Sequence, residues 1–335
     1  MSVALKALVN SGSEGMLSIL EPWFSDESVS EIMINKPHEV FIEKNGVINR
    51  HTIDDLTPLT LKRMFAFIAN ESNQILNEKN PLLSANLYNG SRGQLIIPPV
   101  SLHYSLSIRK PSIKPMSLKS YSESDFFKKT NKFSLSGWTR DTKTTKLNSL
   151  YNRGMWAEFL KCAIHAKKNI VISGGTSSGK TTFLNALLQE IPENSRLITL
   201  EDTREVRITH PNSLSLIASK GGQGTSNVSM QDLVQSSLRL RPDRIIMGEI
   251  RGAEILDFLS ACSTGHEGSI TSIHANNPKV AFMRMTQMYK LNHVPSMTDQ
   301  DILNELHETI DVIVQVEKSF GKRQVQSIYF KDCCA

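Results

Sequence analysis

The sequence predicts an α/β protein, with a carboxyl-terminal P-loop domain of the doubly wound type and a smaller amino-terminal α+β domain on an antiparallel sheet. Residues 170–173 form an apolar run that leads straight into GGTSSGKTT at 174–182 and then into a helical pattern. From residue 196 onwards, short apolar runs alternate with helical patterns, which is typical of a doubly wound sheet. The first 110 residues instead carry short strand patterns separated by Asn-Gly and Pro turns, which is typical of an antiparallel sheet.

Residues 1–110 are therefore expected to form one domain. The expected elements are a helix at 15–24, strands at 31–35 and 39–43, a helix at 58–74, and strands at 83–88, 92–97 and 103–109. The helix at 58–74 carries Leu61, Met64, Phe65 and Ile68 on one face. Such a face should pack against the sheet.

Residues 111–147 have a different character and are expected to be a basic linker. Proline, serine and threonine are frequent there, and lysines stand at 114, 119, 128, 129, 132, 143 and 146. One or two helical turns are expected at 123–129. A connection of this length is unusual in a compact protein and tends to have a function, such as letting the two domains of one chain pack against different neighbours. The alternative is a solvated charged spacer.

Residues 148–335 are expected to form the second domain, around the P-loop. The expected strands lie at 170–173, 196–200, 206–210, 214–218, 244–247 and 269–274, with a closing hairpin at 312–316 and 324–330. The expected helices lie at 156–167, 180–191, 230–240, 253–262, 279–291 and 299–309, the last capped by Thr298. In such a sheet the ligand binds outside the carboxyl ends of the strands.

The composition sets bounds on the class of protein. A hydrophobic content of 39% is enough for real cores, and no run approaches the 18 or so apolar residues of a membrane span. Residues 1–14 lack the pattern of a secretory signal, and the cysteines at 162, 262, 333 and 334 lack metal-ligand spacing, so reduced thiols in the cytoplasm are expected. A net charge of +5 permits a membrane surface or a nucleic acid as partner without indicating either.

The loop at 174–182 has the residue types that a phosphate-binding loop needs. Gly174 and Gly179 let successive N–H groups turn inwards beside the positive end of the next helix. Lys180 would supply a charge to the β and γ phosphates, and the Thr181 hydroxyl would ligate Mg²⁺. The candidate nucleotide-binding residues of the loop are Gly174, Gly175, Thr176, Ser177, Ser178, Gly179, Lys180, Thr181 and Thr182. A chance match is disfavoured by the strand before the loop and the helix after it.

Acidic residues stand where two of the expected strands end. Glu249 follows the apolar strand at 244–247, where a carboxylate is costly unless it serves a cation or a water molecule. Glu201 and Asp202 follow the strand at 196–200 and could hold metal-bound water, or pair with arginines nearby. His274 lies at the end of a further strand, and a lone histidine there is more often a core residue than a functional one.

Four motifs in order resemble those of the secretion and pilus ATPase superfamily. They are the P-loop, LED at 200–202, RLRPDRIIMGEIR at 239–251, and TGHEG at 264–268 followed by HA at 274–275. These are similar to its Walker A, Asp box, Walker B and His box. In addition, IMINKP at 32–37, GSRGQ at 90–94, PP at 98–99 and SIRKPS at 107–112 resemble the amino-terminal domain of the type IV secretion branch. The Walker B motif has no aspartate immediately before its glutamate, which is usual for this superfamily.

The resemblance implies a hexameric, RecA-like ring ATPase that uses ATP and Mg²⁺, with nucleotide held between the two domains at subunit boundaries. It also implies roles for individual residues. Lys180 and Thr181 would bind phosphate and metal, Glu249 would be the catalytic carboxylate and a metal ligand, and Glu201 would assist Glu249. His274 would sense the γ phosphate, and Arg92 and Arg109 would contact the phosphates from the amino-terminal domain. Arg239, Arg241 and Arg251 are candidates for an arginine finger, with ordinary surface pairing as the alternative.

The implied function is that of a motor that powers pilus biogenesis and the passage of DNA or protein substrates through a type IV secretion system. Its implied partners are further copies of itself, inner-membrane channel components and other secretion ATPases, at the cytoplasmic side of the inner membrane. In one subset of the branch, which has a similar long linker, the amino-terminal domain packs over a neighbour's nucleotide domain. The alternatives are a pilus or type II secretion motor, and a RecA-type nucleic-acid motor that would use Phe126, Phe127, Phe133 and Trp138.

Overall fold

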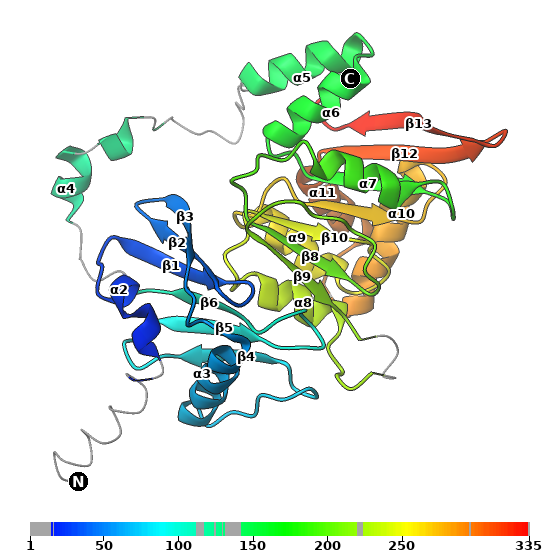
Figure 1. Cartoon of the computed structure of the whole chain (residues 1–335). Coiled ribbons are helices and arrows are strands. Elements are labelled where there is room, and N and C mark those ends of the chain that lie inside the picture. Colours follow the sequence, from blue (N-terminus) through cyan, green and yellow to red (C-terminus); the bar gives the residue numbers. More distant parts are fainter. Residues whose placement is uncertain are drawn as a thin grey trace.

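The structure, a computed structural model, describes residues 15, 17–111, 117–123, 125–128, 130, 142–219, 224–294 and 296–333. Two β-sheets lie side by side in it, one built from the amino-terminal part of the chain and one from the carboxyl-terminal part (Figure 1). The predicted α/β class with an antiparallel amino-terminal sheet is confirmed. No helix in the described ranges is both long and apolar enough to cross a membrane.

The amino-terminal sheet has six strands in the order β3-β2-β1-β6-β5-β4, and neighbouring strands pair antiparallel. The strands are β1 Val29–Ile34, β2 Glu39–Lys44, β3 Val47–Thr52, β4 Leu82–Asn86, β5 Arg92–Ile96 and β6 Ser105–Arg109. They follow the short helices η1 Ser18–Leu20 and α2 Glu21–Phe24. Helix α3, Pro58–Glu71, starts at its cap Thr57 and buries the four apolar residues that the sequence places on one face.

The carboxyl-terminal sheet has seven strands in the order β13-β12-β7-β11-β10-β8-β9, and only β12 and β13 pair antiparallel. The strands are β7 Ile170–Gly174, β8 Leu197–Glu201, β9 Ser213–Ile217, β10 Arg244–Met247, β11 Ile270–Ile273, β12 Val312–Ser319 and β13 Lys322–Phe330. This is the doubly wound arrangement that the sequence predicts, with β7 near the middle of the sheet.

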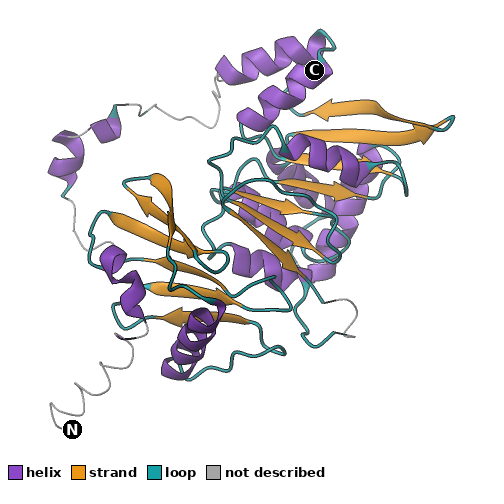
Figure 2. Ribbon diagram, in the orientation of Figure 1, coloured by secondary structure: helices purple, strands orange, loops and turns teal. Residues whose placement is uncertain are grey.

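Helices cover both faces of this sheet (Figure 2). One face packs against α6 Trp156–His165 and α7 Lys180–Leu188, and the other against α8 Met230–Ser237, α9 Ile255–Ser263, α10 Pro278–Tyr289 and α11 Asp299–Thr309. A short 3-10 turn, η3 Lys290–Asn292, follows α10. The predicted cap of α11 is confirmed, because Thr298 and Asp301 form a reciprocal capping box.

The predicted strand at 206–210 is wrong. The chain is irregular there, because side chains rather than a neighbouring strand bind its backbone. The N–H groups of Glu205 and Val206 donate to Oε1 of Glu201, each at 2.8 Å, and that of Arg207 donates to Oδ1 of Asn185, also at 2.8 Å. Because these N–H groups already donate to side chains, they are not available for hydrogen bonds to a neighbouring strand.

The predicted linker contains more helix than expected. Besides α4 Leu118–Glu123 and η2 Asp125–Phe127, helix α5 spans Thr142–Asn152 and so begins inside the region assigned to the linker. Its buried Leu147 belongs to the core of the carboxyl-terminal sheet, and the rings of Tyr151 and Phe159 meet edge to face. Helix α4 stands apart from both sheets (Figure 1). Most of the other linker positions, including Phe133 and Trp138, lie outside the described residues.

A fully buried arginine joins the two sheets. Arg196, just before β8, donates to the carbonyl of Leu240 at 2.8 Å, to Oδ1 of Asn35 at 2.9 Å and to Oγ of Ser107 at 3.3 Å. Ser107 lies on β6 and Asn35 directly follows β1, so the arginine bridges the two sheets. Burial lowers its pKa to about 9, which still leaves it charged at neutral pH.

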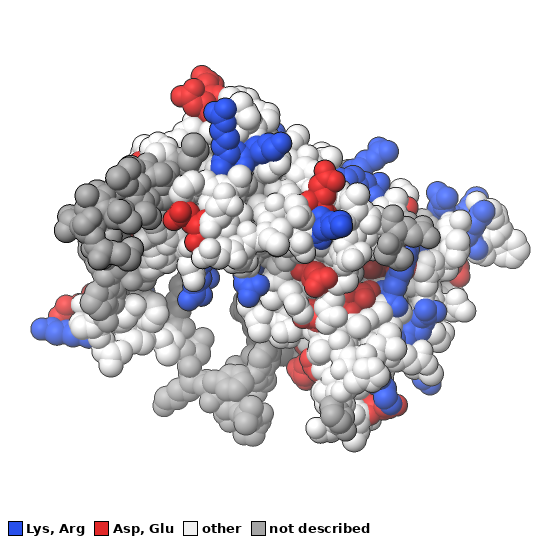
Figure 3. Space-filling view, turned by 90° about the horizontal axis from the view of Figure 1, so that it is seen from below, with Lys and Arg blue, Asp and Glu red and all other residues white. Residues whose placement is uncertain are grey.

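Acidic and basic side chains are interspersed on the face shown in Figure 3. This mixture agrees with the modest net charge of the chain. The described residues of that face therefore form no continuous basic groove of the kind that tracks a nucleic-acid backbone. Among the described cysteines, Cys162, Cys262 and Cys333 are free thiols.

Candidate functional site

The P-loop runs from the end of β7 at Gly174 to the start of α7 at Lys180. Gly179 caps the helix with a φ of 96°, a left-handed conformation that favours glycine. At Gly174 a Cβ atom would lie 2.5 Å from the carbonyl oxygen of Val316 on β12, so this position has no room for a side chain. The two glycines therefore have distinct roles: Gly174 allows close packing on β12, and Gly179 allows the turn into the helix.

A cavity of about 410 Å³ lies over this loop. It forms where β7, β8, β10 and β11 end, since the carboxyl ends of parallel strands meet at one edge of a sheet. It brings together six of the predicted site residues that lie far apart in the sequence: Lys180, Thr181, Glu201, Glu249, Arg251 and His274. The loop residues Thr176, Ser177, Ser178, Gly179 and Thr182 line it as well.

Lys180 is buried at the base of the cavity. Its Nζ donates to the carbonyl oxygens of Gly174 at 3.0 Å and Gly175 at 3.1 Å, and lies 3.3 Å from Nδ1 of His274. Burial lowers the pKa of Lys180, since the charged amine loses water, and the nearby carboxylate of Glu249 works against that shift.

Glu249 lies between a cation and the histidine. Its Oε2 accepts from Nε of Arg251 at 2.8 Å, and its Oε1 lies 2.8 Å from Nε2 of His274. The contact with His274 lacks the alignment of a hydrogen bond, so Oε1 has no donor among the described residues. Arg251 also pairs with Asp202. Burial lowers the pKa of His274, although Glu249 favours its charged form, so the imidazole is neutral at pH 7.

Glu201 presents one free oxygen to the same cavity. Oε1 accepts the two backbone N–H groups of residues 205 and 206, whereas the buried Oε2 has no hydrogen-bond partner in the described part of the chain. Burial raises the pKa of this carboxyl group. Gly248 makes room for it, because a Cβ there would lie 3.2 Å from Cγ of Glu201.

The residues of the cavity fit a nucleotide-bound Mg²⁺ rather than a metal caged by protein alone. No group of three or more His, Cys, Asp or Glu side chains in the described ranges could hold a metal ion. Mg²⁺ in nucleotide sites needs only one or two protein oxygens, because phosphates and water supply the others. The Thr181 hydroxyl, which donates to Oε2 of Glu205 at 3.1 Å, is an oxygen ligand of that type. So are Oε2 of Glu201 and Oε1 of Glu249, which accept no hydrogen bond from the described residues.

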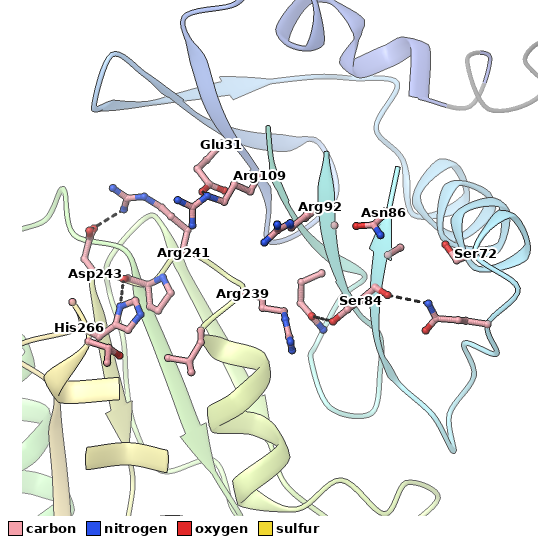
Figure 4. A pocket seen from close by; sticks show the side chains of 18 residues that line it. Glu31, Ser72, Ser84, Asn86, Arg92, Arg109, Arg239, Arg241, Asp243 and His266 are labelled. Atoms are coloured by element: carbon pink, nitrogen blue, oxygen red, sulfur yellow. Dashed lines mark hydrogen bonds and ion pairs between the residues drawn. The ribbon is translucent and has the colours of Figure 1, made fainter. Parts of the chain in front are cut away.

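Four other predicted residues lie elsewhere. Arg92, Arg109, Arg239 and Arg241 line a separate cavity of about 900 Å³ between the amino-terminal sheet and residues 238–243 and 264–266 (Figure 4). The structure therefore does not bring them to the P-loop of their own chain. Arg241 is paired, with Glu43 at 2.5 Å and with Asp243 at 2.8 Å. His266 of the TGHEG motif lines this cavity too, and its Nδ1 lies 3.0 Å from the carbonyl oxygen of Pro242.

Arg92 and Arg109 face each other directly across β5 and β6. Like charges at directly opposed positions destabilise a sheet. Arg109 has a partial partner, since its Nε lies 3.6 Å from Oε1 of Glu31, whereas no side-chain partner of Arg92 occurs among the described residues. An arrangement that costs stability in this way is typical of a site for an anion.

One basic residue of the P-loop cavity was not predicted from the sequence. Arg323 on β13 lines the cavity, and its Cδ would lie 2.9 Å from a Cβ on Gly179. No motif contains it, and it lies 144 positions from Gly179 in a polar strand of the closing hairpin. Only the pairing of β12 with β7 could have indicated that this hairpin runs beside the loop.

Comparison with known proteins gives the family context of this site. Residues 15–319 match the family described as type II/IV secretion system protein. The type IV secretion system protein VirB11 of Bartonella quintana is 36% identical, over 98% of this chain and 97% of its own. PtlH, a type IV secretion system protein of Bordetella pertussis, is 34% identical, over 94% of each chain. The crystal structure of the VirB11 ATPase from the Brucella suis type IV secretion system in complex with sulphate superimposes with a TM-score of 0.89 at 31% identity, covering 96% of this chain and 99% of that one.

Proposed function

The chain belongs to the type II/IV secretion system protein family, and we propose that it is the ATP-hydrolysing ring motor of a type IV secretion system. In this role it powers pilus biogenesis and the passage of DNA or protein substrates across the bacterial envelope. Relatives named as type IV secretion system proteins match nearly the whole chain, which supports this choice over a pilus or type II secretion motor.

One observation carries the chemical part of the proposal. Glu201 and Glu249, from the ends of two neighbouring parallel strands, each present a buried oxygen without a hydrogen-bond donor among the described residues, and both line the P-loop cavity. Buried polar atoms are normally paired, so such atoms mark a place for a ligand, a metal or a reacting water molecule. Beside a phosphate-binding loop, that ligand is a nucleoside triphosphate with its metal and water.

The described residues suggest a division of labour in hydrolysis. The loop amides and Lys180 hold the phosphates, and Thr181 and Glu249 are the protein oxygens that would hold Mg²⁺. When bound with ATP, Mg²⁺ would offset the charge that develops on the phosphates. Glu249 orients the attacking water and takes its proton, with Glu201 beside it, and His274 contacts the γ phosphate. Catalysis rests on positioning and electrostatics, without a covalent enzyme intermediate.

Arg251 is the arginine-finger candidate that lies in the cavity, whereas the amino-terminal arginines are assigned to a neighbouring subunit. In a homohexamer, Arg92 and Arg109 would reach the phosphates bound at the next subunit's P-loop, and Arg241 would serve at the same boundary. All three line a cavity separate from the P-loop cavity of their own chain, and Arg92 and Arg109 oppose each other across β5 and β6, which supports this assignment. So does the position of α4, apart from both sheets (Figure 1).

The domain division and the cellular setting belong to the same proposal. Residues 1–110 form the amino-terminal domain, 111–147 the linker and 148–335 the ATPase domain, with α5 starting inside the linker span. The motor works at the cytoplasmic side of the inner membrane with channel components and other secretion ATPases. Nucleic acid is a transported substrate rather than a bound track, and the interspersed charges in Figure 3 support this distinction.

Steady-state ATP hydrolysis across a range of protein concentrations, with mass measured in parallel, tests the proposal. Specific activity should rise as a species of six chain masses forms, and Lys180→Ala should abolish hydrolysis. Full specific activity in a monomer would refute the shared site. Hydrolysis that persists unchanged in Lys180→Ala would refute the P-loop as the ATPase site.

A further inference from the structure

The closing hairpin runs alongside the P-loop. Strand β12 pairs in parallel with β7 as far as Val316 opposite Gly174, and then continues three residues further to Ser319. Strand β13 returns from the turn, with Arg323 opposite Lys318. The hairpin therefore extends past the end of β7, where the phosphate-binding loop begins, and projects beyond the neighbouring strands in Figure 1.

The stem of Arg323 packs on Gly179, the residue that caps α7. A Cβ built on Gly179 would lie 2.9 Å from Cδ of Arg323 and 3.5 Å from its Nε. The guanidinium is thus held near the amino end of the helix, where the loop amides and the helix dipole already favour negative charge. Arg323 is exposed on its other side and lines the cavity that also contains Lys180.

Among the described residues, Arg323 differs from the other two cations of this cavity in having no partner. Lys180 donates to two loop carbonyls, and Arg251 pairs with Glu249 and Asp202. In the described part of the chain, the guanidinium of Arg323 makes neither a hydrogen bond nor an ion pair. An arginine is always charged and carries five donors in a planar fork that matches phosphate oxygens. A cation placed against a helix amino end without an anion is suited to a polyanionic ligand.

We propose that Arg323 is a nucleotide-binding residue whose guanidinium contacts the phosphate chain of ATP at the P-loop of its own subunit. This inference rests on the proposed function, because it needs nucleotide at the P-loop. It adds to that site a contact from β13, outside the four motifs and on the flank of the loop opposite Glu249. The sheet order places Arg323 and Glu249 on opposite sides of the loop, since β12 and β13 lie on one side of β7 while β11, β10 and β8 lie on the other.

The neighbouring lysine provides a matched control. Lys322 is also exposed and basic and also lies on β13, but it does not line the cavity. Successive side chains of a strand point to opposite faces, so Lys322 points away from the side that Arg323 presents to the loop. Arg323→Met keeps the apolar stem that packs on Gly179 and removes the charge, whereas Arg323→Lys keeps the charge and removes the fork.

The test is calorimetric binding of ATP and, separately, of inorganic tripolyphosphate, both with Mg²⁺, to the full chain and to four variants. Arg323→Met should raise the Kd for both ligands about tenfold, which is the size expected for a charge-assisted hydrogen bond. Arg323→Lys should lie between Arg323→Met and the unaltered chain, and Lys322→Met should stay within about twofold. Thermal unfolding checks that the variants remain folded.

Three results would overturn the inference. If Arg323→Met binds both ligands within about twofold of the unaltered chain while Lys180→Ala binds them weakly, Arg323 only packs on the loop, and the proposed function survives. If Arg323→Met weakens ATP but leaves tripolyphosphate unchanged, the contact is to base or ribose and not to phosphate. If Lys180→Ala also leaves binding unchanged, the P-loop is not the nucleotide site, and the proposed function fails together with the inference.

Discussion

Nε2 of His274 lies 2.8 Å from Oε1 of Glu249. The histidine ends one parallel strand and the glutamate follows the next strand in the sheet, so the backbone pairing of β10 with β11 brings them together. On its other side, the imidazole faces the amine of Lys180. A sequence-distant lysine, histidine and glutamate thus form one contact chain across the floor of the cavity, and His274 is not the isolated core residue that its position alone would indicate.

ATP hydrolysis should fall at an acidic pH, lower than the ordinary imidazole pKa of 6.5, because His274 gains a proton there. Burial holds the folded-state pKa of this imidazole below its ordinary 6.5, so the neutral form persists at pH 7 and is lost as the pH falls through that lowered pKa. His274→Gln should reduce kcat by tenfold or more and abolish this acid limb, since glutamine does not titrate. A pH profile of kcat checks this, and an unchanged acid limb in His274→Gln would assign it to another group.

Glu249→Gln should separate nucleotide binding from hydrolysis. Removing the carboxylate takes away the group proposed to accept the water proton, so turnover should fall about a hundredfold or more while the Kd for ATP changes by less than about threefold. Single-turnover kinetics and calorimetry on the same preparation measure the two quantities. Unchanged turnover would show that the chain hydrolyses ATP by another carboxylate, with Glu201→Gln as the next variant to compare.

Mixing two inactive variants should restore activity if subunits share sites. Arg92→Ala lacks the amino-terminal phosphate contact and Lys180→Ala lacks the P-loop lysine, so neither ring should hydrolyse ATP. In randomly mixed rings, about a quarter of the sites would combine an intact Arg92 from one subunit with an intact Lys180 from its neighbour. Mass measurements verify that the subunits have exchanged. After exchange, the rate of hydrolysis should be about a quarter of that of the unaltered ring. Mixed rings without activity would mean that Arg92 acts within its own subunit.

Glu31 should make the fold less stable as the pH rises. Burial raises its pKa from 4.5 to about 7, although Arg109 opposes the shift. The folded state therefore binds the proton more tightly than the unfolded chain, and this contribution to stability is complete below pH 4.5 and is lost between pH 4.5 and 7. At pH 8, Glu31→Gln should raise the unfolding free energy by roughly 1–3 kcal/mol, whereas Glu71→Gln, exposed on α3, should change it little. Urea titrations at pH 5 and pH 8 measure this difference, and equal effects of Glu31→Gln at both pH values would contradict it.

Arg196→Met should lower the unfolding free energy by roughly 2–4 kcal/mol, because it leaves buried acceptors on both sides of the junction between the sheets without their donor. Among these acceptors are the carbonyl of Leu240 and Oδ1 of Asn35. Arg63→Met, on the exposed side of α3, is the matched control and should be close to neutral. Chemical denaturation gives both values. A loss no larger than that of the control would mean that the arginine contributes little to the junction between the sheets.

The sequence predicts those parts of the fold whose signals are local. The strand, glycine turn and helix around Lys180 are contiguous, and the capping pair of Thr298 and Asp301 is three residues apart, so both can be recognised without knowledge of the tertiary structure. The apolar strands of the parallel sheet are recognisable because they are buried on both faces. The same reasoning places Glu201, Glu249 and His274 at one edge of that sheet, where the structure has them.

The errors arise where tertiary contacts override the local pattern. Residues 206–210 have the composition of a strand, but Glu201 and Asn185 bind the backbone just before and within them. Helix α5 has a mainly polar sequence and gains its place through the buried Leu147. Arg196 and Arg323 carry no motif, because burial between two sheets and proximity across a hairpin are properties of the assembled fold.

The junction around Arg196 has a mechanical consequence. Two apolar surfaces can slide past each other in small steps, since apolar contact has no preferred direction. A buried guanidinium that donates to fixed oxygens on both sides of the junction has all its hydrogen bonds in one relative position of the two sheets. In nearby positions the buried charge would lose these acceptors, which is costly. A rotation of the amino-terminal sheet relative to the carboxyl-terminal sheet would therefore break and re-form the Arg196 hydrogen bonds in one step. Such a rotation would occur between two defined positions and not by gradual sliding.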